Sequence, residues 1–167
     1  MTVKATRAER SRASFRQMDP VVEIQRLKYR YARTLDTKSW TEFADTMLPD
    51  ATATYGANLA FESRAALIEF MKTTLGPSVI TEHHCGHPEI EVDGGVATGV
   101  WYLSDTVIIP EHQVILRGAA FYRDRYVRCE DGAWRIAHTG YERTYEYVVS
   151  TNDVPSFHLT ANMWSEQ

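Results

Sequence analysis

The residues most suited to chemistry form one short cluster. His83, His84, Cys85 and His87 fall within five positions, so three of the six histidines lie together with one of the two cysteines. Histidine both accepts and donates a proton near neutral pH, which makes acid/base catalysis the first candidate. A metal site through His83, Cys85 and His87 is the alternative. Residues on one face of a strand are about 7 Å apart and no fourth ligand is apparent, so we predict no metal.

A partner carboxylate for this cluster is predicted at Asp36. Asp19-Pro20 is a typical helix start, and the residues that follow it at spacings of three and four predict an amphipathic helix to about residue 37. The apolar positions are Ile24, Leu27, Tyr31 and Leu35. A carboxylate at a helix C-terminus interacts unfavourably with the negative end of the helix dipole, so an aspartate at position 36 suggests a functional role. The alternative is a surface aspartate that begins a turn.

A second set of polar side chains lies in the predicted last strand. Strict alternation would place three of them on one face: Tyr141, Arg143 and Tyr145. It would place on the opposite face Trp134, Ile136 and His138. An arginine between tyrosines could bind an anionic or carbonyl oxygen, or it could simply pair with Glu142 or Glu146 at an exposed edge.

The preceding strand carries small residues between Arg117 and Tyr122, where a ligand could approach the backbone. Small residues there could equally relieve the curvature of a sheet. We include both end residues among the candidate substrate-binding positions.

The elements that must position these residues are helices first and strands afterwards. Ser39 opens a predicted capping box for a short second helix, and Ser63 a third helix that ends at Gly76-Pro77. A short strand is predicted at 51–55, and four long strands at about 79–92, 96–109, 113–128 and 133–147. We therefore predict an α+β domain in which N-terminal helices pack on a strongly curved, mainly antiparallel sheet.

The composition describes one ordinary globular domain. The chain has 167 residues, 44% hydrophobic and 24% charged, with a net charge of −4. We predict a loose basic arm at 1–18 and a single domain at 19–167. The charge gives no nucleic-acid footprint, and no apolar run suits a membrane span or a secretory signal. Cys85 and Cys129 fit no metal or redox spacing, so a reduced, cytoplasmic location is predicted.

Familiar catalytic motifs are absent from the sequence. It holds no nucleophile elbow, P-loop, dinucleotide fingerprint or metalloprotease helix. Proton-transfer chemistry without a cofactor remains by elimination. Nine tyrosines and four tryptophans could line a pocket for a ring-shaped ligand, although such residues are more often plain core.

The chain resembles the SnoaL-like branch of the nuclear-transport-factor-like superfamily over residues 19–165. The matching stretches are Tyr31 to Asp36 followed by Trp40 and Phe43, the histidine-bearing strand, and the segments 121–128, 131–136 and 140–143. Within the branch the sequence most resembles bacterial bile-acid dehydratase, and more distantly scytalone dehydratase and lindane dehydrochlorinase. The resemblance implies a cone with an internal cavity, no cofactor, and often a homotrimer.

Carried over residue by residue, the resemblance implies an acid/base pair of Asp36 and His83. It makes Tyr31 and Tyr55 pocket hydroxyls and Arg143 a further polar group at the cavity. Glu82 and His84 stand where the bile-acid enzyme has methionines, and Arg117 stands where it has an asparagine. Because these differing residues lie near the pocket, the substrate of the bile-acid enzyme cannot be assigned to this chain.

The leading hypothesis is therefore a cofactor-independent lyase, a dehydratase of a hydrophobic hydroxylated ring compound such as a steroid, a polyketide or a lignin-derived aromatic. We predict Asp36, His83 and Tyr31 as catalytic residues, and as substrate-binding residues Tyr55, Arg143, Arg117, Tyr122 and His84. The alternatives are a formaldehyde-releasing carbon–carbon lyase or an isomerase that uses the same pair, and a binding protein without turnover. The predicted partners are the small-molecule substrate and further copies of the chain, in a trimer or a dimer.

Overall fold

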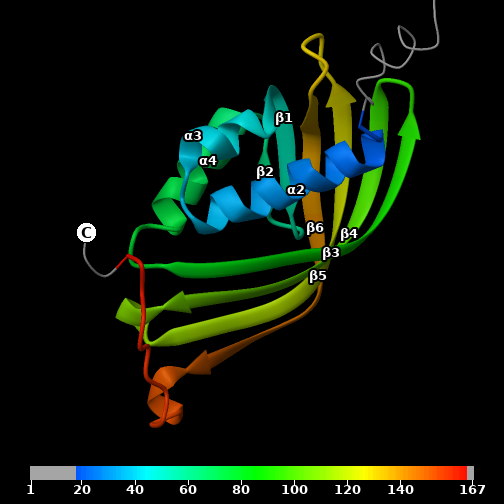
Figure 1. Cartoon of the computed structure of the whole chain (residues 1–167). Coiled ribbons are helices and arrows are strands. Elements are labelled where there is room, and N and C mark those ends of the chain that lie inside the picture. The colour runs from blue at the N-terminus through cyan, green and yellow to red at the C-terminus, as the bar shows by residue number, and fades with distance from the viewer. Residues whose placement is uncertain (1–17, 165–167) are drawn as a thin grey trace, which may run out of the picture.

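The computed structural model describes residues 18–164 and contains helices followed by long strands (Figure 1). The helices are α2 (Pro20–Asp36), α3 (Trp40–Asp45) and α4 (Arg64–Thr74), with short 3₁₀ turns at Pro110–His112 and Thr151–Asp153. The strands are β1 (Met47–Tyr55), β2 (Leu59–Phe61), β3 (Ile80–Asp93), β4 (Val96–Ile109), β5 (Val114–Arg128) and β6 (Trp134–Ser150).

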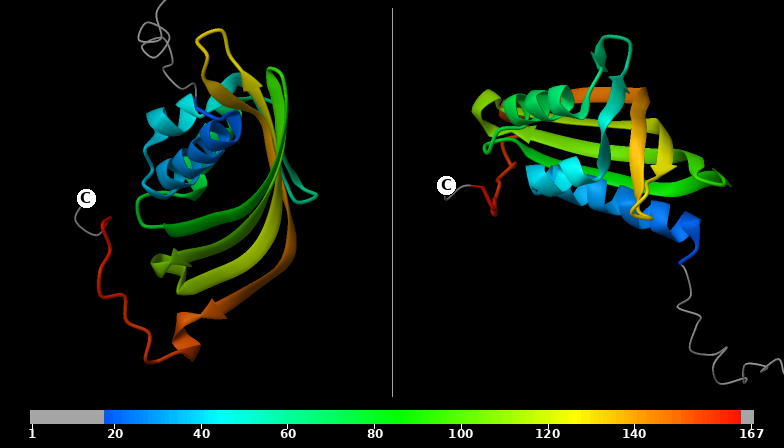
Figure 2. Two further views of the ribbon diagram at one scale, coloured as in Figure 1. Left: turned by 45° about the vertical axis from the view of Figure 1, so that its right-hand side comes forward. Right: turned by 90° about the horizontal axis from the view of Figure 1, so that it is seen from above.

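A single six-stranded sheet in the order β2-β1-β6-β5-β4-β3 forms the wall of the molecule. Strand β1 runs parallel to β6, and every other neighbouring pair is antiparallel. The sheet curves strongly, and the three helices lie against its concave side (Figures 1 and 2). This confirms the predicted α+β class with helices packed on a curved, mainly antiparallel sheet, although the sheet is not closed.

Helix α2 lies across the concave face and contributes most of the helical part of the core. Asp19 caps it, its Oδ1 accepting a hydrogen bond of 2.8 Å from the Val21 amide, and Pro20 occupies the first turn as predicted. Its apolar stripe is buried against the sheet, with Ile24 and Tyr31 almost fully enclosed. Burial of this stripe holds the last residue of the helix, Asp36, against strand β3.

The other predicted elements differ from the structure in three places, and the first is strand β2 (Leu59–Phe61), which was not predicted. Ser39 precedes α3, but its side chain makes no capping hydrogen bond; its Oγ lies 3.0 Å from Thr37 Oγ1 instead. Strand β1 starts at Met47 rather than at residue 51, because its first residues pair with β6, a partner far along the chain. The long strands agree with the predicted ranges to within three residues at each end.

Residues 1–17, almost all of the predicted arm, lie outside the described residues. Within residues 18–164, no helix is both long and apolar enough to cross a membrane.

Candidate active site

Asp36 and His83 meet directly at the edge of the concave face. The His83 Nδ1 atom lies 2.6 Å from Asp36 Oδ1, and the His83 backbone amide donates a second hydrogen bond of 2.9 Å to Asp36 Oδ2. Thr81 Oγ1 donates a third, of 2.8 Å, to Asp36 Oδ1. Three contacts to one strand therefore fix both oxygens of a carboxylate that ends a helix.

This arrangement decides which nitrogen of His83 is free. An ionised carboxylate only accepts hydrogen bonds, so Nδ1 of the neutral ring carries the proton and Nε2 carries the lone pair. The side chains are shielded, with 12% of His83 and 23% of Asp36 exposed. A carboxylate that holds the ring in one tautomer and stabilises its protonated form is what a general base requires.

His83 forms part of the wall of a half-enclosed cavity of about 140 Å³. Leu35, Met71 and Val107 contribute to its apolar lining. The polar side chains in the lining, besides His83 and Thr74, are Tyr55, Asp105, Tyr122, Tyr141 and Arg143. An apolar cavity with a few convergent polar groups is typical of small-molecule sites, but such sites usually span about 300–1,000 Å³, so this cavity by itself is the size of a single small ring.

The cavity tyrosines are neutral hydrogen-bond donors at ordinary pH. Burial raises the pKa of Tyr55 and Tyr122 well above the usual value, and it raises the pKa of Tyr141 as well. Tyr31 is fully enclosed behind this wall; burial raises its pKa too, and its hydroxyl lies 3.0 Å from that of Tyr55. The structure therefore places Tyr55 at the cavity and Tyr31 next to it, one residue further from the ligand space.

Arg143 enters the cavity as one half of an ion pair that the sequence did not indicate. Its Nη2 lies 2.7 Å from Asp105 Oδ2, and its Nη1 contacts the other oxygen of the same carboxylate. Its Nε also lies 3.0 Å from Glu146 Oε2. The pairing with Glu146 is one of the two alternatives derived from the sequence, while Asp105, which is only 4% exposed, was missed.

Gly118 makes room for this arginine. A Cβ atom at position 118 would lie 2.6 Å from Arg143 Nη1 and 2.8 Å from the Tyr145 carbonyl oxygen. Gly118 also lies opposite Asp105 in the register of β4 and β5. The absence of a side chain at Gly118 therefore leaves the space that the Arg143 guanidinium group occupies. Relief of sheet curvature was the only structural reason that the sequence offered for small residues in this strand.

The predicted face pattern of β6 is wrong, because the strand contains two irregularities. The register with β5 shifts between the partners of Arg125 and Tyr126, and again between the partners of Ala119 and Ala120. The first shift places Tyr141 and Arg143 on the same concave side as the buried Ile136. The second turns Tyr145 outward, where 55% of it is exposed.

Strand β3 departs from simple alternation as well. Its register with β4 shifts between Gly86 and Glu89, and His87 has a positive φ of 48°. His87 is consequently exposed and does not share the inner face with His83. It lines, with the exposed His84, an outer groove of about 600 Å³ between α2 and β3, whose wall also includes His83 and Asp36. His84 therefore does not line the inner cavity.

Arg117, a predicted substrate-binding residue, lies away from the cavity. Arg117 is exposed on β5 and is absent from the cavity lining. Among residues 18–164, no three His, Cys, Asp or Glu side chains are grouped in a way that could hold a metal ion.

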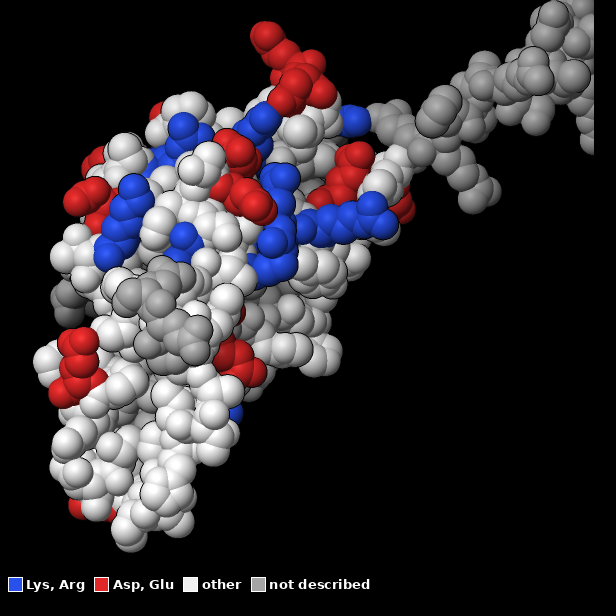
Figure 3. All heavy atoms as spheres, turned by 60° about the vertical axis from the view of Figure 1, so that its left-hand side comes forward, with Lys and Arg blue, Asp and Glu red and all other residues white. Residues whose placement is uncertain are grey.

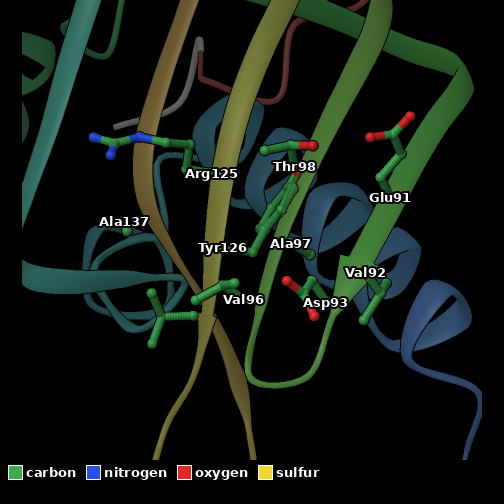
Figure 4. A pocket seen from close by; sticks show the side chains of 10 residues that line it. Glu91, Val92, Asp93, Val96, Ala97, Thr98, Arg125, Tyr126 and Ala137 are labelled. Atoms are coloured by element: carbon green, nitrogen blue, oxygen red, sulfur yellow. The ribbon is translucent and has the colours of Figure 1, made fainter.

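A larger hollow of about 460 Å³ lies elsewhere, beside the β3–β4 hairpin (Figure 4). Apolar side chains such as Val92 and Val96 line it together with Glu91, Asp93 and Arg125. None of the predicted site residues borders it, and it contains no bonded acid/base pair. Chemistry therefore favours the smaller cavity at His83, which also contains the tyrosines Tyr55, Tyr122 and Tyr141; the outer groove borders the same acid/base pair but none of these three tyrosines.

The fold and the site together define a class: a helix-covered cone whose cavity holds an Asp–His pair and tyrosine hydroxyls. A family model described as "SnoaL-like domain" matches residues 16–140. The chain belongs to this family.

Other known proteins are similar to this chain in sequence or in fold. An uncharacterised protein of Mycobacterium tuberculosis is 28% identical over 130 residues, which is 77% of this chain and 88% of that protein. A scytalone dehydratase-like structure from Novosphingobium aromaticivorans has a TM-score of 0.70 at 18% identity, covering 85% of this chain and 90% of the other. The hexachlorocyclohexane dehydrochlorinase LinA-type3 of Novosphingobium barchaimii has a TM-score of 0.71 at 16% identity, covering 84% and 94%. These two likenesses describe the fold.

Proposed function

We propose that this protein is a cofactor-independent lyase that eliminates water from a hydrophobic, hydroxylated ring compound. The observation that carries the proposal is the Nδ1–Oδ1 contact of 2.6 Å between His83 and Asp36 on the wall of a half-enclosed cavity. Membership of the SnoaL-like family supports it, as does the likeness in fold to a dehydratase-like chain and a dehydrochlorinase. We also propose that, within the SnoaL-like family, the chain is most similar to bile-acid dehydratase.

In the proposed reaction, His83 is the base. Its Nε2 atom removes a proton from a carbon next to a carbonyl group, or from a phenol conjugated with the leaving group. The imidazolium that forms lies against the Asp36 carboxylate, which stabilises its charge. The electron pair released from the broken bond moves onto the carbonyl or phenolic oxygen and then expels the hydroxyl group as the new double bond forms.

Tyr55 is the proposed donor to the oxygen atoms of the substrate. It lines the cavity, and burial keeps it protonated. Its hydroxyl can stabilise the developing oxyanion or protonate the departing hydroxyl, while Tyr31 orients it through the 3.0 Å contact. We therefore propose that Tyr31, which the sequence predicted as catalytic, acts on the reaction through Tyr55.

A largely apolar substrate without a carboxylate or phosphate group fits the charged side chains that line the cavity. Arg143 is already paired with Asp105 and Glu146, so it offers little unpaired charge to an acidic substrate. Charged side chains of both signs gather over the helices in Figure 3, whereas the lower part of that face is mostly uncharged. Several apolar side chains are exposed in the last part of β6 and the segment after it: Tyr147, Val148, Leu159 and Met163.

The deciding experiment is a thermal-shift screen followed by mass spectrometry. Wild type and Asp36→Asn would be tested against steroid enones, polyketide-like phenols and lignin-derived diaryl alcohols. We expect a compound that stabilises both proteins and loses the mass of one water molecule only with wild type. Loss of formaldehyde would instead identify the carbon–carbon lyase, and a stabilising compound that neither protein changes would contradict the enzymatic function.

The assembly is a separate proposal. We propose a homotrimer in the cytoplasm, which static light scattering tests as a particle of three times 19.1 kDa. A monomer at micromolar concentration would contradict it.

A further inference from the structure

A charged pair that the proposed reaction does not use lies directly behind the cavity wall. Lys28 Nζ on α2 lies 2.7 Å from Asp124 Oδ2 on β5, and neither side chain has any exposed surface. Moving two charges out of water costs several kcal/mol per ion, and well-packed apolar residues often replace such pairs without loss of stability. Stability alone is therefore a weak reason for this pair.

The two partners of the pair face different surroundings. The Lys28 ammonium group lies 3.5 Å from the centre of the Tyr122 ring and 4.6 Å from that of Tyr31. Tyr122 lines the cavity, and Tyr31 contacts the cavity residue Tyr55. The cation of the pair is thus in contact with the aromatic wall of the site.

The anion of the pair is held by residues outside the cavity lining. Asp124 accepts hydrogen bonds of 2.7 Å from the Tyr126 hydroxyl and 2.8 Å from Thr139 Oγ1. Trp101 Nε1 in turn donates to the Tyr126 hydroxyl at 2.8 Å. This network fixes the carboxylate, and through it the position of the ammonium group behind the tyrosines.

The other charges near the cavity make this cation significant. Arg143 is paired with two carboxylates, Asp105 and Glu146. Among the described residues, Lys28 has an ion pair with Asp124 alone. A cation against the face of an aromatic ring is attracted to it, and a buried charge stabilises opposite charge that develops nearby. The remaining titratable groups beside the cavity are the Asp36–His83 pair, the thiol of Cys85 and the tyrosines.

We propose that Lys28 is a positioning residue of this site, which holds the Tyr122 and Tyr31 rings from behind and makes the cavity favour a ligand oxygen that carries negative charge. The ligand class is a phenol or enol that binds as its anion, or a carbonyl compound that becomes enolate-like during the reaction. The inference deepens the proposed function and rests on it for the identity of the site.

The test uses a variant that removes both charges and keeps the volume of both side chains. In Lys28→Met with Asp124→Asn, the amide oxygen at position 124 can still accept one of the two hydrogen bonds from Tyr126 and Thr139, and the other hydroxyl can rotate to accept a hydrogen bond from the amide NH2 group. Because this variant leaves no unpaired buried charge, we expect it to fold. The matched control is Arg135→Met with Asp131→Asn, which removes an exposed ion pair with an N–O distance of 2.7 Å at the β5–β6 turn.

The probe is 4-nitrophenol, whose phenolate is yellow and whose ionisation is therefore read by absorbance. We expect wild type and the control to bind the phenolate more tightly than the phenol, and the double variant to lose about tenfold of this preference, or one pKa unit of the bound probe. Equal preferences in wild type and the double variant would overturn the inference, as would failure of wild type to bind the probe.

Two further outcomes keep the result interpretable. If the double variant does not fold, Lys28→Gln with Asp124→Asn replaces the pair by two neutral amides that can hydrogen-bond to each other, and it should show the same loss of phenolate preference; an unchanged preference would overturn the inference. Absence of any elimination activity together with a preserved phenolate preference would contradict the proposed reaction and leave the role of Lys28 intact.

Discussion

His83 and Asp105 lie directly opposite each other on the neighbouring strands β3 and β4. The base of the proposed reaction and the carboxylate that holds Arg143 therefore occupy adjacent positions on one face of the sheet. Continuing across the sheet, Asp105 lies opposite Gly118, and Gly118 lies opposite Glu146. One row of positions perpendicular to the strands thus contains the proposed base and the two carboxylates, Asp105 and Glu146, that hold Arg143.

Replacement of His83 is the primary test of catalysis. We expect His83→Ala to lower kcat/KM by about 10²–10⁴-fold, the usual contribution of general acid–base catalysis. Its melting temperature should stay close to that of wild type, because Asp36 keeps the hydrogen bonds from the backbone amide of residue 83 and from Thr81 Oγ1. Circular dichroism and kinetics with the substrate found in the screen measure both. Unchanged turnover would exclude His83 as the base.

Substitution of Gly118 should displace Arg143. In Gly118→Ala the new methyl group meets both the guanidinium group and the Tyr145 carbonyl oxygen, and the carbonyl belongs to the backbone. We expect a loss of about 1–3 kcal/mol in the free energy of unfolding, measured by urea denaturation. The control is Gly76→Ala, where a Cβ atom would meet nothing within 4 Å. Equal stabilities of the two variants would contradict this account of Gly118.

The two tyrosines of the 3.0 Å contact should differ in their kinetic effects. Tyr55→Phe and Tyr31→Phe each remove one partner of a buried hydrogen bond, so both should destabilise the protein by about 1–3 kcal/mol. Since only Tyr55 lines the cavity, its loss should reduce kcat/KM more strongly. Kinetics of both variants decide this, and a larger effect of Tyr31→Phe would identify Tyr31 as the direct donor.

The buried tyrosines predict a loss of stability in alkali. Burial raises the pKa of Tyr31, Tyr55 and Tyr122 in the folded state, whereas in the unfolded chain a tyrosine titrates near pH ~10. Above that pH the unfolded state releases protons that the folded state retains, so stability falls as the pH rises. Each tyrosine contributes up to about 1.4 kcal/mol per pH unit. Urea denaturation between pH 9 and 11 should show a shallower slope for Tyr31→Phe.

The regular elements and the acid/base pair were accessible from local signals. Capping chemistry at Asp19, apolar spacing along α2 and turn residues between the long strands predicted their bounds closely. Asp36 and His83 could be predicted because Asp36 ends a helix, His83 lies near the start of a strand, and the family resemblance pairs the two residues. The arrangement of the remaining cavity residues was not accessible in this way.

The sequence by itself determined the layered class of the fold and the candidate pair, because caps, turns and hydrophobic periods act over a few residues. Only the tertiary structure decided which face each polar side chain takes. The register shifts in β3 and β6 turn His87 and Tyr145 outward and bring Arg143 inward. Asp105 and Lys28 likewise acquire their roles from partners on other strands. Alternation cannot predict a bulge, since strand register depends on pairing and burial across the whole sheet.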